Sequence, residues 1–238
     1  MLRIGTAGWT IRRQYAAVFA GPGPHLTRYA GRLNAVEINS SFYRPHKSAT
    51  YARWSRETPD DFSFSVKMIR TVTHEARLKD TAPMLERFFA ECAGLGNKLG
   101  CVLVQLPPSL MLDIPVADAF FIALRRVYRG AVAFEPRHVS WFTQTAADLL
   151  AEHDIARVLA DPPPAKLDDA PAGATGLRYW RLHGSPRMYY SDYGADFLDA
   201  LARRLAESRT GDSWCIFDNT ALGHATANAL ALGERMAQ

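Results

Sequence analysis

Eight short runs of apolar residues recur along the chain, each ending at or beside a polar residue that is followed by a loop or a helical pattern. The runs are Leu2–Thr6, Ala35–Asn39, Phe62–Lys67, Cys101–Leu106, Ala131–Arg137, Arg157–Asp161, Tyr179–His183 and Ser213–Asn219. Runs of this length and composition are typical of strands that are buried on both faces. We therefore expect eight strands in a parallel sheet.

Segments with apolar residues at helical spacing separate most of these runs. The clearest are 84–95, which follows Pro83, then 197–205, and Ala225–Met236 near the carboxyl terminus. Such segments are long enough for right-handed crossovers between parallel strands. Eight strand–helix units of about 30 residues each predict an α/β chain that forms one domain, a single (β/α)8 TIM-type barrel over residues 1–238.

The sixth unit departs from this pattern. Pro162, Pro163, Pro164 and Pro171 follow the sixth predicted strand within ten residues. Proline lacks a backbone N–H and fixes φ, so this density forbids a regular helix. We expect a Pro-rich loop that replaces or weakens the sixth helix, either as a surface crossover or as a lid over the site.

Composition sets limits on the class of protein. The chain is 48% hydrophobic and 22% charged with a formal charge of +4, which permits nucleic acid as a partner without requiring it. Its three cysteines, Cys92, Cys101 and Cys215, lack nearby cysteine or histidine partners, so neither disulfides nor a zinc site is indicated. No signal peptide or long apolar span appears. We expect a cytoplasmic protein without membrane contacts.

Three predicted strands carry polar pairs two residues apart near their carboxyl ends. The pairs are Glu37 with Asn39, Glu135 with Arg137, and Arg181 with His183, and apolar residues alternate with them. Residues two apart in a strand point to the same side. Because helices would cover the outer face, the charged pairs are expected to point into the mouth of the barrel.

Other strands end in polar residues too. These are Lys67, Gln105, Asp161 and the pair Asp218 and Asn219. The active site of barrel enzymes lies at this end of the strands, so these polar residues together predict a functional site. The alternative is a structural network of ion pairs, for example Glu37 with Lys67 and Asp161 with Arg181.

Loops after the strands add further candidates. His183-Gly184-Ser185-Pro186-Arg187 and Asn219-Thr220-Ala221-Leu222-Gly223-His224 occupy the places where barrels most often hold phosphate. His74 and His138 suit acid/base work, or they lock loops through hydrogen bonds. Tyr43 and Trp141 would form walls of the rim, or else they cap the core.

Carboxylates and histidines, which are the usual protein ligands of divalent metals, occur among these candidates. No short ligand motif is present, although barrel sites often take one ligand from each strand. Lys67, Arg137 and Arg181 at the same mouth would repel a divalent cation. We expect no cofactor and no metal site, with a divalent ion as the less favoured alternative.

Taken together, several motifs resemble the YecE-like family, a bacterial and archaeal family of unknown function. They are Gly5-Thr6-Ala7-Gly8-Trp9, Val36-Glu37-Ile38-Asn39-Ser40-Ser41-Phe42-Tyr43, Thr73-His74, Gln105-Leu106-Pro107-Pro108, Phe134-Glu135-Pro136-Arg137-His138-Val139-Ser140-Trp141, Arg181-Leu182-His183-Gly184, and Phe217-Asp218-Asn219 with Gly223-His224-Ala225. The resemblance implies a (β/α)8 barrel, distantly related to sugar isomerases. Asp218 stands where an asparagine is usual in the family.

The leading hypothesis is an enzyme that acts on a small anionic, phosphorylated or carboxylated, sugar-like substrate by acid/base isomerisation or hydrolysis. The candidate catalytic residues are Glu37, Lys67, His74, Glu135, Asp161 and His183, and the candidate substrate-binding residues are Asn39, Tyr43, Gln105, Arg137, His138, Trp141, Arg181, Asp218, Asn219 and His224. Arg181 and Arg137 would hold the anion, and Lys67 would stabilise developing negative charge. The alternatives are a protein that binds or processes nucleic acid and a metabolite sensor without catalysis.

Overall fold

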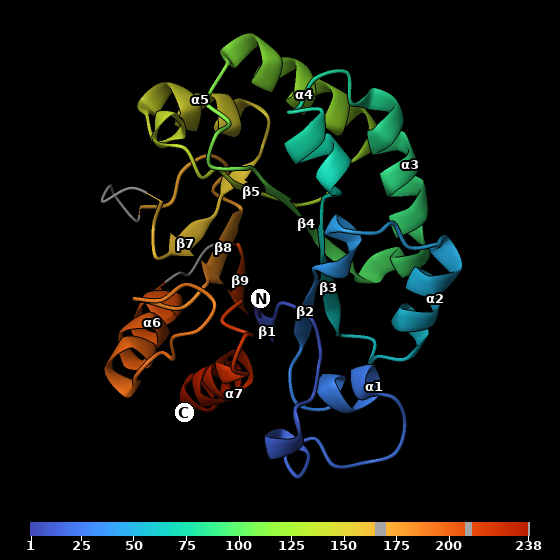
Figure 1. Cartoon of the computed structure of the whole chain (residues 1–238), viewed down its shortest axis with the longest axis vertical. Helices are drawn as coiled ribbons and strands as arrows, with labels where there is room; N and C mark the ends of the chain where they lie inside the picture. The colour runs from blue at the N-terminus through green and yellow to red at the C-terminus, as the bar shows by residue number, and fades with distance from the viewer. Residues whose placement is uncertain (165–169, 208–210, 238) are drawn as a thin grey trace.

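A computed structural model of the chain describes residues 1–164, 170–207 and 211–237 (Figure 1). Its strands are β1 (Leu2–Thr6), β2 (Ala35–Ile38), β3 (Ser63–Lys67), β4 (Leu99–Gln105), β5 (Val132–Glu135), β6 (Ala156–Arg157), β7 (Leu159–Asp161), β8 (Leu177–Leu182) and β9 (Asp212–Phe217). They fall on the eight predicted runs, and the sixth run is divided at Val158 into β6 and β7. The apolar runs therefore located the strands.

The strands form two parallel sheets, in the orders β1-β9-β8-β7 and β2-β3-β4-β5-β6. Every pair of neighbouring strands within them is parallel. This confirms an α/β fold built on parallel sheets. The two sheets approach each other at two places, where Ala7 bridges Glu37 and where Val158 links β6 to β7.

Helices lie outside the strands (Figure 1). They are α1 (His25–Ala30), α2 (Ser48–Arg56), α3 (Ala82–Cys92), α4 (Ile114–Val127), α5 (Gln144–Glu152), α6 (Ala195–Glu207) and α7 (His224–Met236), with short 3-10 turns at Arg13–Tyr15, Ser40–Phe42, Ala93–Lys98 and Val139–Trp141 and a π-helical turn at Thr71–Glu75. On α6 the predicted face is the buried one, through Leu198, Leu201 and Leu205. No helix in the described part of the chain has the length and apolarity to span a bilayer.

The Pro-rich segment forms no helix in its described parts, 162–164 and 170–176. Residues 165–169, which belong to the same predicted loop, lie outside the described residues. The chain thus passes from β7 to β8 as the proline content predicts, without a described crossover helix.

Alternation along the strands divides the apolar side chains into two cores. Val36, Ile38 and Phe134 belong to the larger core, which the strands share with the helices. Leu103 and Tyr179 belong to a second cluster, made almost entirely of strand residues. Since the predicted outward-facing residues lie in the first core, their polar neighbours along the strands lie on the inner side.

Candidate functional site

Arg181, on β8, lies at the centre of a buried charged cluster. Its Nε and Nη2 donate to the two carboxylate oxygens of Glu37 at 3.0 and 2.8 Å, and Nη1 donates to Glu135 at 3.2 Å. Its Nη2 also lies 3.1 Å from Asp218. One guanidinium therefore binds carboxylates from β2, from β5 and from the end of β9.

We name the charged cluster by its members, which are Glu37, Lys67, Glu135, Arg137, Arg181, His183 and Asp218. All of them are buried or nearly so. They come from five strand ends. Glu37, Glu135, Arg137, Arg181 and His183 were expected at the mouth from strand parity, and Lys67 and Asp218 because each lies at the end of a predicted strand. The fixed fork of an arginine suits this geometry, because its five N–H donors can satisfy several carboxylates at once.

Glu37 also contacts a side chain that lies nearer the amino ends of the strands. Tyr179, two residues before Arg181 on β8, donates its hydroxyl hydrogen to Glu37 at 3.0 Å and lies 2.9 Å from Ser65 Oγ. Both carboxylate oxygens of Glu37 are thus occupied by Arg181 and Tyr179. Sequence reasoning missed Tyr179 and Ser65 as members of this network, although each lies two residues before a predicted member and so on the same face.

His183 connects two carboxylates. Its Nδ1 lies 2.9 Å from Asp218, while Nε2 lies 2.9 Å from Glu135 and 2.7 Å from Arg137 Nη2. Because a carboxylate only accepts, Nδ1 carries a hydrogen, and in the neutral ring Nε2 accepts from Arg137. On a second protonation, Nε2 would donate to Glu135. The ring therefore has a partner for each of its two protonation states.

The balance of charge fixes the protonation of the carboxylates. Burial alone would raise the pKa of Glu135, but the charges of Arg137, Arg181 and His183 outweigh it and hold that pKa well below its usual range. Burial is likewise outweighed at Asp218, where Arg181 and His183 lower the pKa. The pKa of Arg181 is raised well above its ordinary value, because the three carboxylates outweigh its burial. Glu135, Asp218 and Arg181 are therefore all charged at neutral pH.

Lys67, at the end of β3, differs from the rest of the cluster. It is 6% exposed, and its ammonium lies 4.5 Å from the centre of the Phe42 ring. No described residue forms a hydrogen bond or an ion pair with this ammonium group. Burial, followed by the charge of Arg181, lowers the pKa of Lys67 to about 8 despite nearby Glu37 and Glu135.

The turn after β2 places Phe42 against Lys67. Ser41 donates to the carbonyl oxygens of Ile38 and Lys67 at 2.8 and 2.7 Å, so the turn is fixed to both strands. The His74 ring, on the π-helical turn, meets the same Phe42 ring at 4.9 Å. Lys67 and His74 therefore share one apolar neighbour.

His74 is a partly exposed titratable group at the rim. Its Nδ1 lies 2.9 Å from Thr73 Oγ1. Burial lowers its pKa, and the charges of Lys67, Arg70 and Arg77 lower it further. The imidazole is therefore neutral at neutral pH and can accept a proton.

Two polar atoms near the cluster are buried without a described hydrogen-bond partner. They are Nε of Arg137 and Oδ1 of Asn39. Asn39 comes two residues after Glu37, and Gln105, half-buried, pairs in register with Glu135. The Arg137 donor, the Asn39 acceptor and the Lys67 ammonium are thus among the polar groups of this site that have no partner in the described part of the chain.

Aromatic residues border the cluster. Tyr43 is 74% exposed and packs edge-on against Phe42. Tyr189, in the loop after β8, lies edge-on to His183 at 5.8 Å and has a φ of 69°, which is unusual for a bulky residue. Burial, followed by Asp218, raises the pKa of Tyr189.

The structure places Asp161 outside the charged cluster, so its predicted position was wrong. Asp161 pairs in register with Leu182, whose side chain lies in the helix-facing core. Its Oδ1 instead accepts from the Tyr193 hydroxyl at 2.8 Å. The parity of β7 explains the error, because Ala160 and not Asp161 pairs with Arg181.

Four other predicted residues have local structural contacts. His138 Nδ1 accepts from Ser140 N at 3.2 Å, and Trp141 is buried and donates to Leu110 O at 2.9 Å. The remaining two lie near α7: Asn219 donates to Ser191 and Asn228, and His224 lies 3.7 Å from Asp192. These contacts match the loop-locking and core-capping alternatives for His138 and Trp141.

Within the described residues no group of three His, Cys, Asp or Glu side chains is arranged to hold a metal ion. Arg181 lies between the carboxylates of the charged cluster and binds the oxygens that a cation would need. The side chains at this position therefore do not fit a divalent ion. The expectation of no cofactor stays a prediction.

The parallel α/β fold, with charged residues gathered at the carboxyl ends of its strands, defines the class of protein in structural terms. The sequence model of the family described as "Protein of unknown function DUF72" matches residues 3–238, and the chain belongs to this family. The resemblance to YecE-like proteins is thereby confirmed.

Relatives carry names that give no activity. The chain is 29% identical to the UPF0759 protein YecE of Escherichia coli K12 over 145 residues, which are 58% of this chain and 53% of that protein. It is 27% identical to the UPF0759 protein YunF of Bacillus subtilis over 175 residues, or 68% and 61% of the two chains. The match thus spans a little over half the length of these relatives.

Solved structures of the family share the fold. A DUF72 family protein from Thermotoga maritima superposes with a TM-score of 0.82 at 24% identity, and all of both chains is covered. One from Enterococcus faecalis gives 0.84 at 18% identity, covering 100% of this chain and 96% of that one. At these identities the likeness concerns the fold alone.

Proposed function

We propose that the two sheets form one closed (β/α)8 barrel. Val158 N donates to Phe134 O at 2.9 Å, which extends the pairing of β6 with β5 up to the residue before β7. At the other junction Gly8 N donates to Glu37 O at 2.9 Å. Tyr179 reaches Glu37 and Ser65 from the opposite sheet, as a closed interior requires.

We propose further that the chain is an enzyme that acts on a small anionic, sugar-like substrate by acid/base isomerisation or hydrolysis at the barrel mouth. The observation that carries this proposal is the environment of the Lys67 side chain. Lys67 is 6% exposed and its ammonium is unpaired among the described residues, while three carboxylates beside it are bound to Arg181. An unpaired buried cation is costly, and an anionic ligand would compensate it.

The geometry redistributes the roles expected from the sequence. Arg181 is occupied by carboxylates, so the anion would be held by Lys67 and by the free edge of Arg137. Glu37 is occupied as well and acts as a positioning residue. Proton transfer then falls to His74, which is partly exposed, and to His183, which has partners for both protonation states.

The site itself supplies the positioning that such chemistry requires. Asp218 fixes the tautomer of His183, and Glu135 connects that ring to Arg137. The unpaired Oδ1 of Asn39 would accept a hydrogen bond from a substrate hydroxyl. A substrate that carries both an anionic group and hydroxyls would satisfy each of the available groups.

We propose a cytoplasmic location for this activity. All three cysteines are buried as free thiols. Burial raises the pKa of Cys92 to about 12, so this thiol stays protonated and inert. Unpaired thiols of this kind are typical of proteins in a reducing compartment.

The experiment has a binding arm and a turnover arm. Wild type and Lys67→Met are screened by thermal shift against phosphosugars, sugar acids and short oligonucleotides, with the exposed Lys47→Met as the matched control. A bound ligand raises the melting temperature by mass action. We expect a shift with sugar-like anions in wild type and Lys47→Met that is lost in Lys67→Met.

Turnover separates the enzyme from a metabolite sensor. Ligands that give a shift are incubated with the protein in deuterated water and followed by proton NMR, which detects exchange at carbon, isomerisation and hydrolysis alike. Binding without any spectral change would favour the sensor. A shift with oligonucleotides alone, weakening steeply with salt, would instead favour a nucleic-acid partner.

A further inference from the structure

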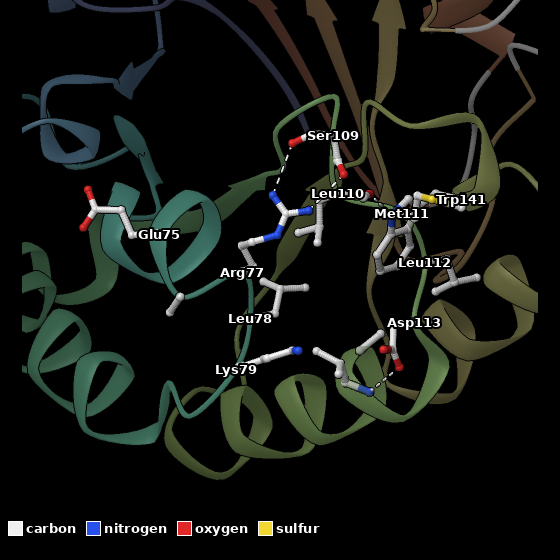
Figure 2. A pocket seen from close by; sticks show the side chains of 13 residues that line it. Glu75, Arg77, Leu78, Lys79, Ser109, Leu110, Met111, Leu112, Asp113 and Trp141 are labelled. Carbon is white, nitrogen blue, oxygen red and sulfur yellow. Dashed lines mark hydrogen bonds between the residues drawn. The ribbon is translucent and has the colours of Figure 1, made fainter.

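A cavity of about 630 Å³ lies between the residues that follow the π-helical turn and the loop after β4. Its walls come from the segment that follows this turn, from the loop after β4 and from the start of α4 (Figure 2). We call it the side cavity. Its volume falls within the range of roughly 300 to 1,000 Å³ that is typical of small-molecule sites.

The loop after β4 is held rigidly at the edge of the side cavity. Arg77 donates from Nη1 and Nη2 to the side chain and backbone oxygens of Ser109 at 3.2 and 2.9 Å (Figure 2). The Trp141 indole donates to Leu110 O at 2.9 Å, and Leu112 N donates to Ser140 at 2.7 Å. Such bonds from two separate elements, the segment at Arg77 and the 3-10 turn at Val139–Trp141, preform the walls.

The opposite wall is built on strained backbone. Arg77, Leu78 and Asp80 have φ angles of 51°, 71° and 51°, in the left-handed region that residues with a side chain rarely adopt. The conformation turns Leu78 inward, where it is 3% exposed and lines the cavity. Strain of this kind persists where the surroundings impose it and is frequent at ligand sites.

Charge in the side cavity is uneven. Of its two acids, Glu75 pairs with Arg70 at 3.4 Å, and Asp113 accepts from the backbone of α4 at Val116. Lys79 is exposed, and no described residue pairs with it; Figure 2 shows its side chain directed across the opening. The acids are thus engaged by their own elements, whereas a cation faces the cavity.

We propose that the side cavity binds a small amphipathic anion, with an apolar ring or branched chain and one carboxylate or sulfonate group. Leu78, Leu110 and Trp141 supply a buried apolar floor, and Met111, 60% exposed, covers the apolar body. Lys79 pairs with the anionic group. The inference goes beyond the proposed function and does not depend on it, because it involves none of the residues of the charged cluster.

The test uses anilinonaphthalene sulfonate as the amphipathic anion and N-phenylnaphthylamine as its neutral counterpart. Both fluoresce on entering an apolar site, so fluorescence titration gives their affinities and stoichiometries. We expect one bound sulfonate per chain, and weaker binding of the neutral probe. Lys79→Met should weaken sulfonate binding about three- to tenfold, and Lys79→Arg should retain it.

Three further variants locate the site. Met111→Glu, which places a negative charge on the wall, should weaken sulfonate binding, whereas Lys47→Met should not. Lys67→Met should bind the sulfonate like wild type. The proposal is overturned if Lys79→Met and Met111→Glu bind like wild type, if both probes bind equally, or if Lys67→Met alone loses binding. That last result would place the anion in the charged cluster and leave the proposed function intact.

Discussion

Lys67 shows how a single residue can lower the stability of the fold at neutral pH. Its pKa falls from 10.5 to about 8, mainly through burial, so the folded chain binds the proton less tightly than the unfolded chain. Between these values the unfolded state binds more protons, and the free energy of unfolding therefore rises with pH. Below pH 8 the full cost of the buried charge is present.

Lys67→Met is accordingly expected to stabilise the protein at pH 7 by roughly 1 to 3 kcal/mol, because it removes the buried charge and keeps the chain length. The advantage should disappear as the pH rises from about 8 to 10.5. Urea denaturation of both proteins across this range measures it. A variant less stable than wild type at pH 7 would show that the ammonium has a stabilising partner.

Arg181 has the opposite effect, since three carboxylates depend on it. Arg181→Met should destabilise the fold by roughly 3 to 5 kcal/mol or prevent folding, because it leaves buried charges uncompensated. Arg181→Lys should rescue it only in part, as an ammonium cannot match the fork that binds Glu37. The denaturation midpoints of the two variants measure these losses of stability, and Arg203→Met, at an exposed position, is the control. Near-equal midpoints for Arg181→Met and wild type would contradict this network.

The sequence predicted members of the charged cluster where a polar pair ended a strand, as with Glu135 and Arg137. Strand parity follows from backbone geometry, so it needs only the right starting residue. It did not support Asp161, which was a candidate only because it ends a strand: Ala156, Val158 and Ala160 face the inner cluster, so Asp161 falls on the opposite side. Tyr179 was missed because an aromatic residue in a strand has no local signal that separates a core residue from a hydrogen-bond donor.

At the scale of elements, the junction between β1 and β2 depends on one glycine. A Cβ on Gly5 would lie 2.0 Å from Ala35 O and 2.7 Å from Ala35 C, both backbone atoms of β2. Gly5→Ala should therefore cost roughly 1 to 3 kcal/mol or more in unfolding free energy. Gly233→Ala, in α7 with no neighbouring atom in the way, should instead stabilise by about 0.5 to 1 kcal/mol. Thermal unfolding of the two variants measures these changes. An unchanged unfolding free energy in Gly5→Ala would indicate that β1 and β2 separate easily.

Elements in which apolar residues recur at a regular spacing could be predicted from the sequence, whereas the turns between them could not. The face of α6 and the strands came from spacing, because burial of apolar groups determines both. The π-helical turn at Thr71–Glu75 and the left-handed residues after it have no such signature. Contacts with distant loops impose them, for example the bonds from Arg77 to Ser109. The side cavity consequently could not be found from the sequence.

At the scale of the whole molecule, the charged cluster joins both sheets, so its ionisation contributes to global stability. The pKa values of Glu135 and Asp218 lie below their ordinary values, since nearby cations outweigh the effect of burial. Groups of this kind stabilise the fold above their unfolded pKa values, and the contribution is lost as the pH falls through them. We expect stability to decline steadily from about pH 5 downward.

Glu135→Gln tests whether the cluster is responsible for this acid sensitivity. At pH 7 the variant should be less stable than wild type by roughly 3 to 5 kcal/mol, because Arg137 and Arg181 lose a buried counter-charge. The difference should narrow below pH 4.5, where wild type takes up a proton on unfolding and the variant has none to take up at this position. Glu86→Gln, at an exposed position on α3, should follow wild type at every pH. Denaturant titrations of the three proteins between pH 3 and pH 7 measure the gap, and a gap that stays constant with pH would locate the acid sensitivity elsewhere in the molecule.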